Sequence, residues 1–430
     1  MSAFFSRQGL SARFATVVVA CLLLCLAFPG GTCKAASDAQ PATDWWQLFD
    51  PRTSPIIPIP EVGTDPNGGT TVGVLPVYLV KDSRGEITEI IAPDVTYNQY
   101  LGYGGHARVL AYPSGDTQWS VEFKAKEHIE RGADFRYATG LSRQTSWSYS
   151  AHLQYDRSAT ARFFGIGNDS SQSAQTNYTN EQVLLDATLG WNLSPALQLG
   201  WTLRPHYVAI EPGAIPSLPF IRQSFPNLPG VATDHEFFNR LYVSYDTRDS
   251  VSLPTKGSQA VVSAGATDSS FLSSTSYAVL GVDVRHYQPV SDRVIVAGHV
   301  ALRYMPEAND APFWALSSLG GDRSVPSEEQ PLRGFGEDRF IDRNLSSGGV
   351  EVRTRVLDLD VFATAVSLEV APFVEAGSVF HSLSDSPVRD LHAVGGVGFR
   401  AIARPSILGY VDVGYGSEGA AVFSGINYPF

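Results

Sequence analysis

The sequence predicts an all-β protein, a transmembrane antiparallel β-barrel of about sixteen strands. Three observations support this fold class: apolar and polar residues alternate over long segments, the N-terminus carries an export-type apolar segment, and aromatic residues gather near the segment ends. Because successive side chains of a strand point to opposite faces, alternation gives each strand one apolar and one polar face. Such strands suit a barrel with lipid outside and water inside.

The N-terminal residues 1–35 are expected to be a cleaved secretory signal peptide. Two arginines precede the apolar segment 14–28, which is too short to span a bilayer comfortably. Small residues place the cleavage site near Ala35, and the alternatives are a lipoprotein signal ending at Cys33 and an uncleaved anchor. All three cysteines lie in this segment, so we expect neither a cysteine metal site nor a thiolate nucleophile in the mature chain.

The alternation is clear over residues 350–356, where valines on one face oppose Glu351, Arg353 and Arg355 on the other. Similar segments run to about ten residues or more, the length that a tilted membrane strand needs. The strands of a soluble β-sandwich, the alternative all-β fold, are about five or six residues long. Aromatic residues near the segment ends fit the girdles of outer-membrane barrels. They include Tyr287, Tyr304, Phe380 and Tyr415.

The barrel is expected over residues 71–430, preceded by a Pro-rich periplasmic N-terminal segment over 36–70. The sixteen strands are predicted near 71–82, 100–112, 116–126, 132–141, 145–156, 179–193, 196–210, 235–247, 256–269, 274–288, 292–305, 345–358, 363–379, 391–402, 406–416 and 420–430. Residues 86–98 fit either a strand of their own or part of a long second strand. An even number is retained because both ends of the barrel are expected in the periplasm.

The lengths of the connections predict the orientation of the barrel. The short turns 192–195 and 246–257 are expected on the periplasmic side, and the long segments 157–178, 211–233 and 306–345 on the outside.

The third of these long segments leads into the most informative stretch of the chain, Pro331 to Arg355. It begins as a turn that presents Arg333 between Leu332 and Gly334-Phe335, and it ends as the charged strand described above. A charged loop that leads into a strand with charges on one face suits a wide barrel with a wet interior. The alternative is a plain surface loop, in which an ion pair of this arginine contributes at most about 1 kcal/mol.

The tetrapeptide Leu332-Arg333-Gly334-Phe335 resembles the Leu/Val-Arg-Gly-Phe/Tyr loop of the BamA/TamA-type outer-membrane assembly factors, the bacterial surface antigen superfamily. The flanking residues 319–322 and 342–344 extend the resemblance. It implies a sixteen-stranded barrel with five strands after this loop, which is extracellular loop 6. In the family this loop folds back into the lumen, where its arginine pairs with acids on the inner wall.

The resemblance also implies the partners of Arg333. The family's wall motif is Phe-x-Asp followed by Ala/Met-Gly, and the match here is Phe373, Glu375 and Gly377, with glutamate in place of aspartate. Asp412, which the alternation also turns inward, is a second candidate. An arginine suits this task because its rigid guanidinium fork can grip a carboxylate with two hydrogen bonds.

The last strand is expected to place Ile426, Tyr428 and Phe430 on one face. A terminal aromatic residue on an alternating strand resembles the sorting signal that outer-membrane barrels present to the barrel assembly machinery. Pro429 departs from that pattern because it removes a backbone donor, which a strand end tolerates.

The sequence contains neither a G-x-S-x-G elbow nor an H-E-x-x-H motif, so we expect no enzyme activity, no metal and no cofactor. A net charge of −12 argues against nucleic acid as a partner. The expected partners are outer-membrane lipid, the assembly machinery during biogenesis, and a periplasmic protein at Trp45-Trp46. The alternatives for Trp45-Trp46 are an anchor at the membrane interface and a disordered linker. We expect a monomer.

The predicted location is the outer membrane of a Gram-negative bacterium. The segment 36–70 is too short for the periplasmic POTRA domains of the resembled family, so the resemblance covers only the barrel. It implies assisted insertion or translocation of protein or lipid at the seam between the first and last strands. The alternatives are a pore gated by the arginine loop and a structural surface protein without transport activity.

Overall fold

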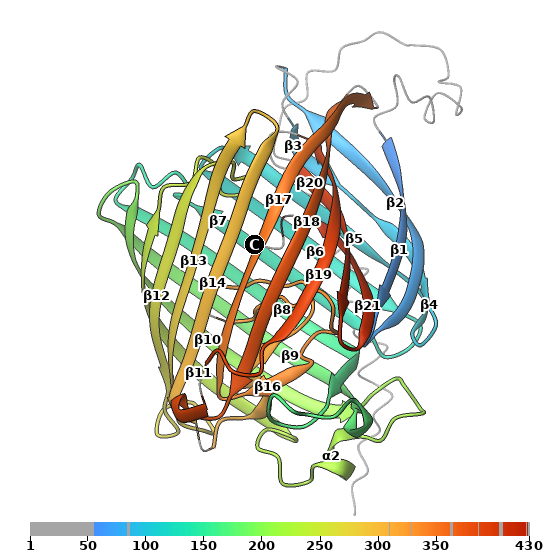
Figure 1. The fold of residues 1–430 in the computed structure, drawn as a ribbon, viewed down its shortest axis with the longest axis vertical. Coiled ribbons are helices and arrows are strands. Elements are labelled where there is room, and N and C mark those ends of the chain that lie inside the picture. Colours follow the sequence, from blue (N-terminus) through green and yellow to red (C-terminus); the bar gives the residue numbers. More distant parts are fainter. Residues whose placement is uncertain are drawn as a thin grey trace, which may run out of the picture. The chain divides into compact units, whose positions relative to one another are not determined.

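A computed structural model describes residues 56–83, 87–308, 310–326, 328–361, 364–385, 387–403, 407–426 and 428. Within these ranges almost all regular structure is β-strand, as Figure 1 shows. The expected signal peptide, Trp45-Trp46 and Phe430 lie outside the described residues. Among the described residues, no helix reaches the length and apolarity that a membrane crossing requires.

The strands belong to one large sheet and one small ribbon. The large sheet contains β1 (Ile56–Asp65), β2 (Gly69–Lys81), β3 (Ile87–Ile91), β4 (Asp94–Asn98), β5 (Gly102–Ser114), β6 (Thr117–Lys126), β7 (Arg131–Thr139), β8 (Trp147–Phe163), β9 (Thr176–Asn192), β10 (Leu197–Pro212), β11 (Thr233–Asp246), β12 (Gly257–Thr267), β13 (Tyr277–Ser291), β14 (Val294–Glu307), β17 (Asn344–Val361), β18 (Thr364–Phe380), β19 (His392–Ala403), β20 (Ile407–Gly416) and β21 (Gly419–Ile426). The ribbon pairs β15 (Ser317–Leu319) with β16 (Phe340–Asp342). The short helices are η2 (Gln172–Ala174), α2 (Ile221–Ser224), η3 (Phe313–Ala315) and η4 (Leu383–Asp385).

The large sheet closes on itself, which confirms the predicted antiparallel barrel. Apart from β3 and β4, each strand pairs with the strands before and after it in this sheet, and β1 meets β21 to complete the ring. Strands β3 and β4 pair with the same two neighbours, β2 and β5, so they form one strand interrupted at Ala92-Pro93. The nineteen strands therefore occupy eighteen positions, because two of them share one.

The predicted count of sixteen strands is thus too low by two. The strand β1 lies within 36–70, which the sequence suggested was a periplasmic segment, so the barrel begins before residue 71. Its prolines favoured a linker, but a strand beside a weakly paired seam tolerates the loss of ladder donors. The second addition is β3–β4, the ambiguous stretch 86–98. Five strands follow the arginine loop, as expected, but that loop becomes the seventh outer connection rather than the sixth.

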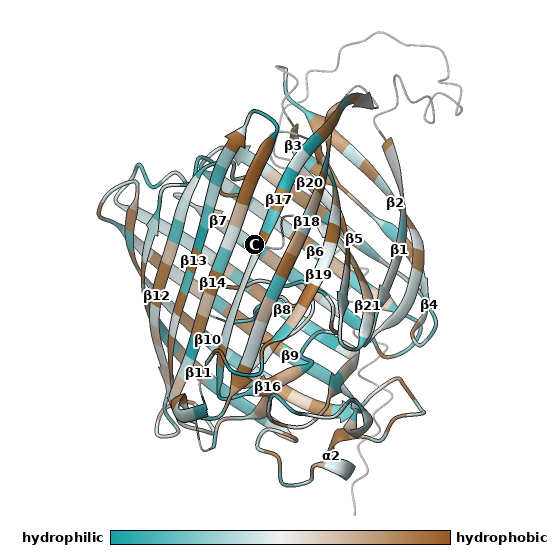
Figure 2. Ribbon diagram, viewed as in Figure 1, coloured by the Kyte–Doolittle hydropathy of each residue, from teal (hydrophilic) through white to brown (hydrophobic). Residues whose placement is uncertain are grey.

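The two faces of the wall differ as the alternation predicted. Along the strands apolar and polar residues alternate in Figure 2, and large apolar side chains such as Leu241, Val300 and Val374 are more than 60% exposed on the outside. On the inside, Glu351 and Arg353 are fully buried. Apolar side chains on the outer face suit contact with lipid, and away from the seam the ladders of the sheet pair the backbone polar groups.

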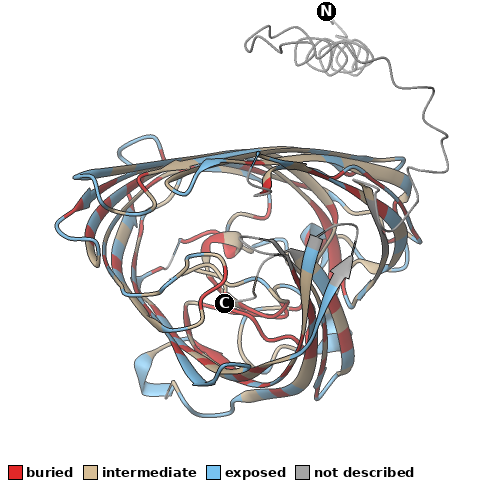
Figure 3. Cartoon of the chain, turned by 90° about the horizontal axis from the view of Figure 1, so that it is seen from above, coloured by how far each residue is buried: buried red, intermediate tan, exposed pale blue. Residues whose placement is uncertain are grey.

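The two largest clusters of buried apolar residues lie inside one end of the barrel, beneath the long connections 164–175, 213–232 and 308–343, and a smaller cluster lies along β2 and β3. One cluster contains Phe163, Tyr178, Val208, Ile210, Ile221, Val231, Phe313 and Ile341. The view along the barrel in Figure 3 shows segments of the chain folded across its interior, with buried residues among them. The short turns that follow β9 and β11 lie at the opposite end.

The last residues depart from the expected strand. The strand β21 ends at Ile426, and the ring of Tyr428 lies over the guanidinium of Arg353, 3.6 Å from the ring centroid. Since Arg353 is buried on the inner wall, Tyr428 lies in the lumen, beyond the end of the strand that was expected to contain it. A buried cation–π contact outweighs the continuation of the alternation here. The side chain of Ile426 lies outside the described residues.

The assignment of side chains to the outer face can be tested by introducing a charged residue on that face. We expect Leu241→Arg, near the middle of β11, to lower the free energy of unfolding in lipid by about 2–4 kcal/mol. The matched control Tyr245→Arg, also outward but near the end of β11, should cost about 1 kcal/mol or less. Urea unfolding in liposomes measures both; equal costs would contradict the assigned outer face.

Candidate functional site

The candidate site is built around the segment between β15 and β16, residues 320–339, which we call the lumen loop. The ribbon closes the base of this loop, with Ser317 paired to Asp342 and Leu319 to Phe340. Backbone hydrogen bonds then tighten the loop: the amide of Gly321 donates to the carbonyl of Phe335, and the amide of Leu332 donates to the carbonyl of Gly321. Gly321 has φ +74°, a conformation that suits glycine.

At the tip of the lumen loop, Arg333 is fully buried against the inner wall. Its Nε donates to Glu375 at 2.7 Å, and its backbone amide donates to the other carboxylate oxygen at 2.8 Å. Its Nη1 donates to Asp412 at 2.6 Å, and Nη2 to Glu351 at 3.3 Å. The structure therefore brings together Arg333 and both predicted partners, on β18 and β20, and adds a third acid on β17.

Two more arginines of the wall complete the charge cluster. The Nε of Arg353 donates to Glu351 at 2.6 Å, and Nη2 of Arg400 donates to the same carboxylate at 3.0 Å. Nη1 of Arg400 also lies 3.3 Å from Asp412. Three guanidinium groups thus lie among three carboxylates, all almost fully buried, which is the arrangement that a buried charge requires.

Sequence reasoning did not identify Glu351 as a partner of Arg333. The alternation had already placed Glu351 on the inner face of β17, so its direction was available. The position of Glu351 along the barrel axis could not be predicted, because it depends on the register Glu351↔Phe373 between β17 and β18. That register sets Glu351 beside Phe373, two residues from Glu375 on the same face.

Apolar packing surrounds the charge cluster. The ring of Phe373 lies under the guanidinium of Arg333, 3.6 Å from its centroid, and adds a cation–π contact. Leu332 and Phe335, which flank the arginine, are buried in one cluster with Phe340 and Phe373. The other members of that cluster are Leu319, Leu345, Val379 and Val394. This packing excludes water and strengthens the electrostatic contacts.

Glycines of the wall let the lumen loop approach closely. A Cβ at Gly414 would collide with the backbone carbonyl of Arg333, and a Cβ at Gly334 would lie 2.7 Å from the amide nitrogen of Gly416. Gly377, the last residue of the predicted wall motif, faces Leu319, whose methyl carbons would lie 3.0 and 3.1 Å from a Cβ there. These contacts explain why small residues stand at Gly334 and Gly377.

The lumen loop reaches the opposite wall through Glu328. Its carboxylate accepts from Arg204 on β10 at 2.8 Å and also contacts Arg240 on β11. Burial of Glu328 opposes its ionisation, but these two guanidinium groups outweigh that effect and lower its pKa to about 2. The loop is therefore held at two ends, by wall arginines on one side and wall acids on the other.

The loop also contacts the turns at the outer ends of the seam strands. Arg339 is buried and donates to Glu418, in the turn between β20 and β21, at 2.6 to 2.9 Å. The side-chain amide of Asn67, in the turn between β1 and β2, donates to the carbonyl of Glu337 at 2.6 Å. One loop thus binds the outer ends of both strands that close the ring.

Comparisons with known proteins give one family match. Residues 116–401 match the model of the Omp85 superfamily domain. A comparison with curated protein sequences finds no match.

Several solved structures resemble this chain at low sequence identity. The BamA structure from Haemophilus ducreyi lacking POTRA domains 1–3 is 15% identical, with 86% of this chain and 74% of that chain covered and a TM-score of 0.49. CdiB from Escherichia coli is 11% identical, with 87% and 62% covered and a TM-score of 0.46. CdiB from Acinetobacter baumannii is 10% identical, with 87% and 59% covered and a TM-score of 0.43. This chain spans less than two thirds of either CdiB chain.

The buried ion pair predicts non-additive mutations. We expect Arg333→Ala and Glu375→Ala each to lower the free energy of unfolding by about 3–5 kcal/mol, because the first leaves Glu375 buried without its arginine and the second removes one of the three acids that balance Arg333. The double variant should be little worse than either single one. Unfolding in urea, together with protease cleavage within 320–339, measures the effect. Arg389→Ala, at an exposed arginine of the β18–β19 connection, is the matched control; additive losses would contradict the pairing.

The lumen loop also predicts a pH effect at Asp322. Burial raises the pKa of this carboxyl to about 6, although the hydroxyl of Tyr410 donates to it at 2.6 Å and acts in the opposite direction. An unfolded aspartate has a pKa near 3.9, so the ionised form is disfavoured in the folded barrel and Asp322 reduces stability as the pH rises from about 4 to 6. Thermal unfolding at pH 4.5 and 7.5 should show a smaller pH dependence in Asp322→Asn; an unchanged dependence would contradict the assignment.

Proposed function

The chain belongs to the Omp85 superfamily, and from this premise we propose that it assists the insertion or translocation of protein or lipid at the bacterial outer membrane. The action takes place at the seam between β1 and β21, which opens sideways into the bilayer. The observation that carries this proposal is the pairing at the seam, where the part of the chain that the structure describes contains a single residue pair, Thr64 with Val422, between the two strands.

The neighbouring pairs show how weak that link is. The strand β1 pairs with β2 over its whole length, from Ile56↔Tyr78 to Asp65↔Gly69. The strand β21 pairs with β20 from Gly409↔Ile426 to Gly416↔Gly419. Since ladder hydrogen bonds hold a barrel wall together in lipid, the seam is where the wall separates at least cost.

The weak pairing also leaves edge groups at the seam with which a client can pair. The free N–H and C=O groups of an edge strand are a template to which another strand can add. In lipid such groups have no water to bind, so a client strand that pairs with β1 or β21 satisfies them. The same opening would perturb the adjacent lipid, which accounts for lipid as an alternative client.

The lumen loop restricts where the seam opens. Its hydrogen bonds from Arg339 to Glu418 and from Asn67 to Glu337 hold the outer ends of β21 and β1 near one another. Neither contact restrains the opposite, periplasmic ends of β1 and β21. We therefore expect the seam to separate first at its periplasmic end, and the pair Thr64–Val422, near the outer end, to part when a client enters.

The alternative of an open pore lacks such support. Leu332, Arg333 and Phe335 of the lumen loop are buried, and the loop contacts both β10–β11 and β17–β20. A loop that crosses the bore with packed apolar and ionic contacts favours a closed lumen. A structural surface protein without activity would be indifferent to any change at the seam.

A disulfide across the seam tests the proposal. We expect Thr64→Cys with Val422→Cys, whose Cα atoms are register partners, to form a crosslink and to abolish the acceleration of barrel folding by the reconstituted protein. The measurement is the folding rate of a second outer-membrane barrel into liposomes, before and after reduction. Full activity in the oxidised state would contradict an opening seam.

The matched control keeps the first cysteine and moves the second. Thr64→Cys with Thr70→Cys links β1 to β2, a pairing that stays closed in the proposal, and should leave the activity unchanged. Resistance of the folded barrel to unfolding on a detergent gel checks that both variants still fold.

A further inference from the structure

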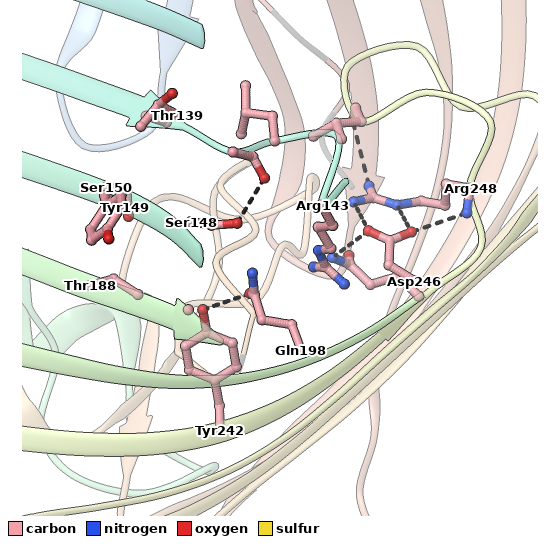
Figure 4. Close-up of a pocket in the computed structure, with 16 residues that line it drawn as sticks. Thr139, Arg143, Ser148, Tyr149, Ser150, Thr188, Gln198, Tyr242, Asp246 and Arg248 are labelled. Carbon is pink, nitrogen blue, oxygen red and sulfur yellow. Dashed lines mark hydrogen bonds and ion pairs between the residues drawn. The ribbon is translucent and has the colours of Figure 1, made fainter. Parts of the chain in front are cut away.

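The inner wall carries a polar pocket at the end of the barrel opposite the lumen loop (Figure 4). Its volume is about 200 Å³. It is lined by the turn that joins β7 to β8, by β8 to β12, and by the turn after β11. Trp147 and Trp191 are half exposed on the outer face, so their neighbours Ser148 and Gly190 face inward and the pocket opens to the lumen.

Arg143 reaches into this pocket from an unusual backbone conformation. Its φ is +54°, in the left-handed region that costs a non-glycine residue about 1 kcal/mol. The conformation turns its side chain over the wall, where Nη2 donates to Ser244 of β11 at 3.2 Å. The second terminal nitrogen, Nη1, is buried without a hydrogen-bond partner among the described residues. A buried N–H group without an acceptor is costly, so binding of an acceptor from outside the chain at Nη1 would be favourable.

The other guanidinium of the pocket is already neutralised. Arg248 donates from Nε and Nη2 to the two carboxylate oxygens of Asp246, at 3.0 and 2.7 Å. Figure 4 shows this fork lying beside Arg143. Among the described residues Arg143 makes no ion pair with a carboxylate, so the pocket keeps one uncompensated positive charge. Its natural counterpart is an anion.

The neutral lining adds further polar groups around that charge. Hydroxyl groups of Ser148 and Ser150 come from β8, and the side-chain amide of Gln259 comes from β12. The hydroxyl of Tyr242 donates to Gln198 at 3.0 Å and fixes the floor of the pocket. An anion beside Arg143 therefore meets polar groups from several sides, which suits a tetrahedral phosphate better than a planar carboxylate.

We propose that this pocket binds a phosphate group, with Arg143 as its principal ligand. The small volume fits inorganic phosphate or a single lipid headgroup rather than a large organic ligand. A bound phosphate would fill the free hydrogen-bonding position of Arg143 and fasten the β7–β8 turn to β11. The site is separate from the seam and the lumen loop, so it stands without the proposed function.

The test is isothermal titration of the purified, folded barrel in non-ionic detergent with inorganic phosphate, at constant ionic strength. We expect binding to the unaltered protein, and at least tenfold weaker binding to Arg143→Gln. The matched control Arg389→Gln, at an arginine exposed at the other end of the barrel, should bind like the unaltered protein. No binding, or equal binding to Arg143→Gln, would overturn the proposal.

Two further arms sharpen the result. Arg143→Lys keeps the charge but loses the fork, so it should bind phosphate several times more weakly than the unaltered protein, and it serves if Arg143→Gln does not fold. Dihexanoyl phosphatidic acid presents the same phosphate on a lipid: tighter binding than inorganic phosphate, lost in Arg143→Gln, identifies a headgroup as the occupant. Comparable binding of the two identifies free phosphate, and acetate binding as tightly as phosphate would overturn the phosphate assignment.

Discussion

The ion cluster around Arg333 is the constraint on which the rest of the barrel depends. A guanidinium with no exposed surface is tolerated only because Glu351, Glu375 and Asp412 surround it with hydrogen bonds. These three acids stand on three different strands, so the lumen loop can occupy its place only when β17, β18 and β20 keep their register. Conversely, strands whose acids share one arginine cannot slide past one another without leaving buried charge unpaired.

This constraint divides the barrel into a stiff part and a weak part. The late strands are fastened by the charge cluster, and the lumen loop extends that hold across the bore to Arg204 through Glu328. The seam lies between β21 and β1, and within the described ranges these two strands share one residue pair. Arg339 and Asn67 also hold the outer ends of the seam strands. The periplasmic ends of β1 and β21 are therefore the least restrained part of the barrel wall.

Much of this architecture follows from the period-two alternation of the sequence. Alternation assigns a residue to the inner or outer face without knowledge of the neighbouring strands. It therefore predicted that Glu375 and Asp412 face the lumen. It does not give register, and so the contact of Glu351 with Arg333 was missed. The strand β1 was not predicted because its prolines lack the backbone N–H groups that pair in a sheet, and a Pro-rich sequence is typical of a linker. The inward turn of Tyr428 depends on Arg353, a residue distant in the chain that no local pattern reveals.

Amide hydrogen exchange of the purified barrel in detergent tests the central claim most directly, because it reports the opening of individual strands. We predict fast exchange for amides of β1 and β21 that face the seam, slow exchange across β18 and β20, and a protected amide at Arg333, which donates to buried Glu375. Equal protection of the seam and of β18–β20, or rapid exchange at Arg333, would contradict a barrel whose lumen loop is fixed and whose seam is weak.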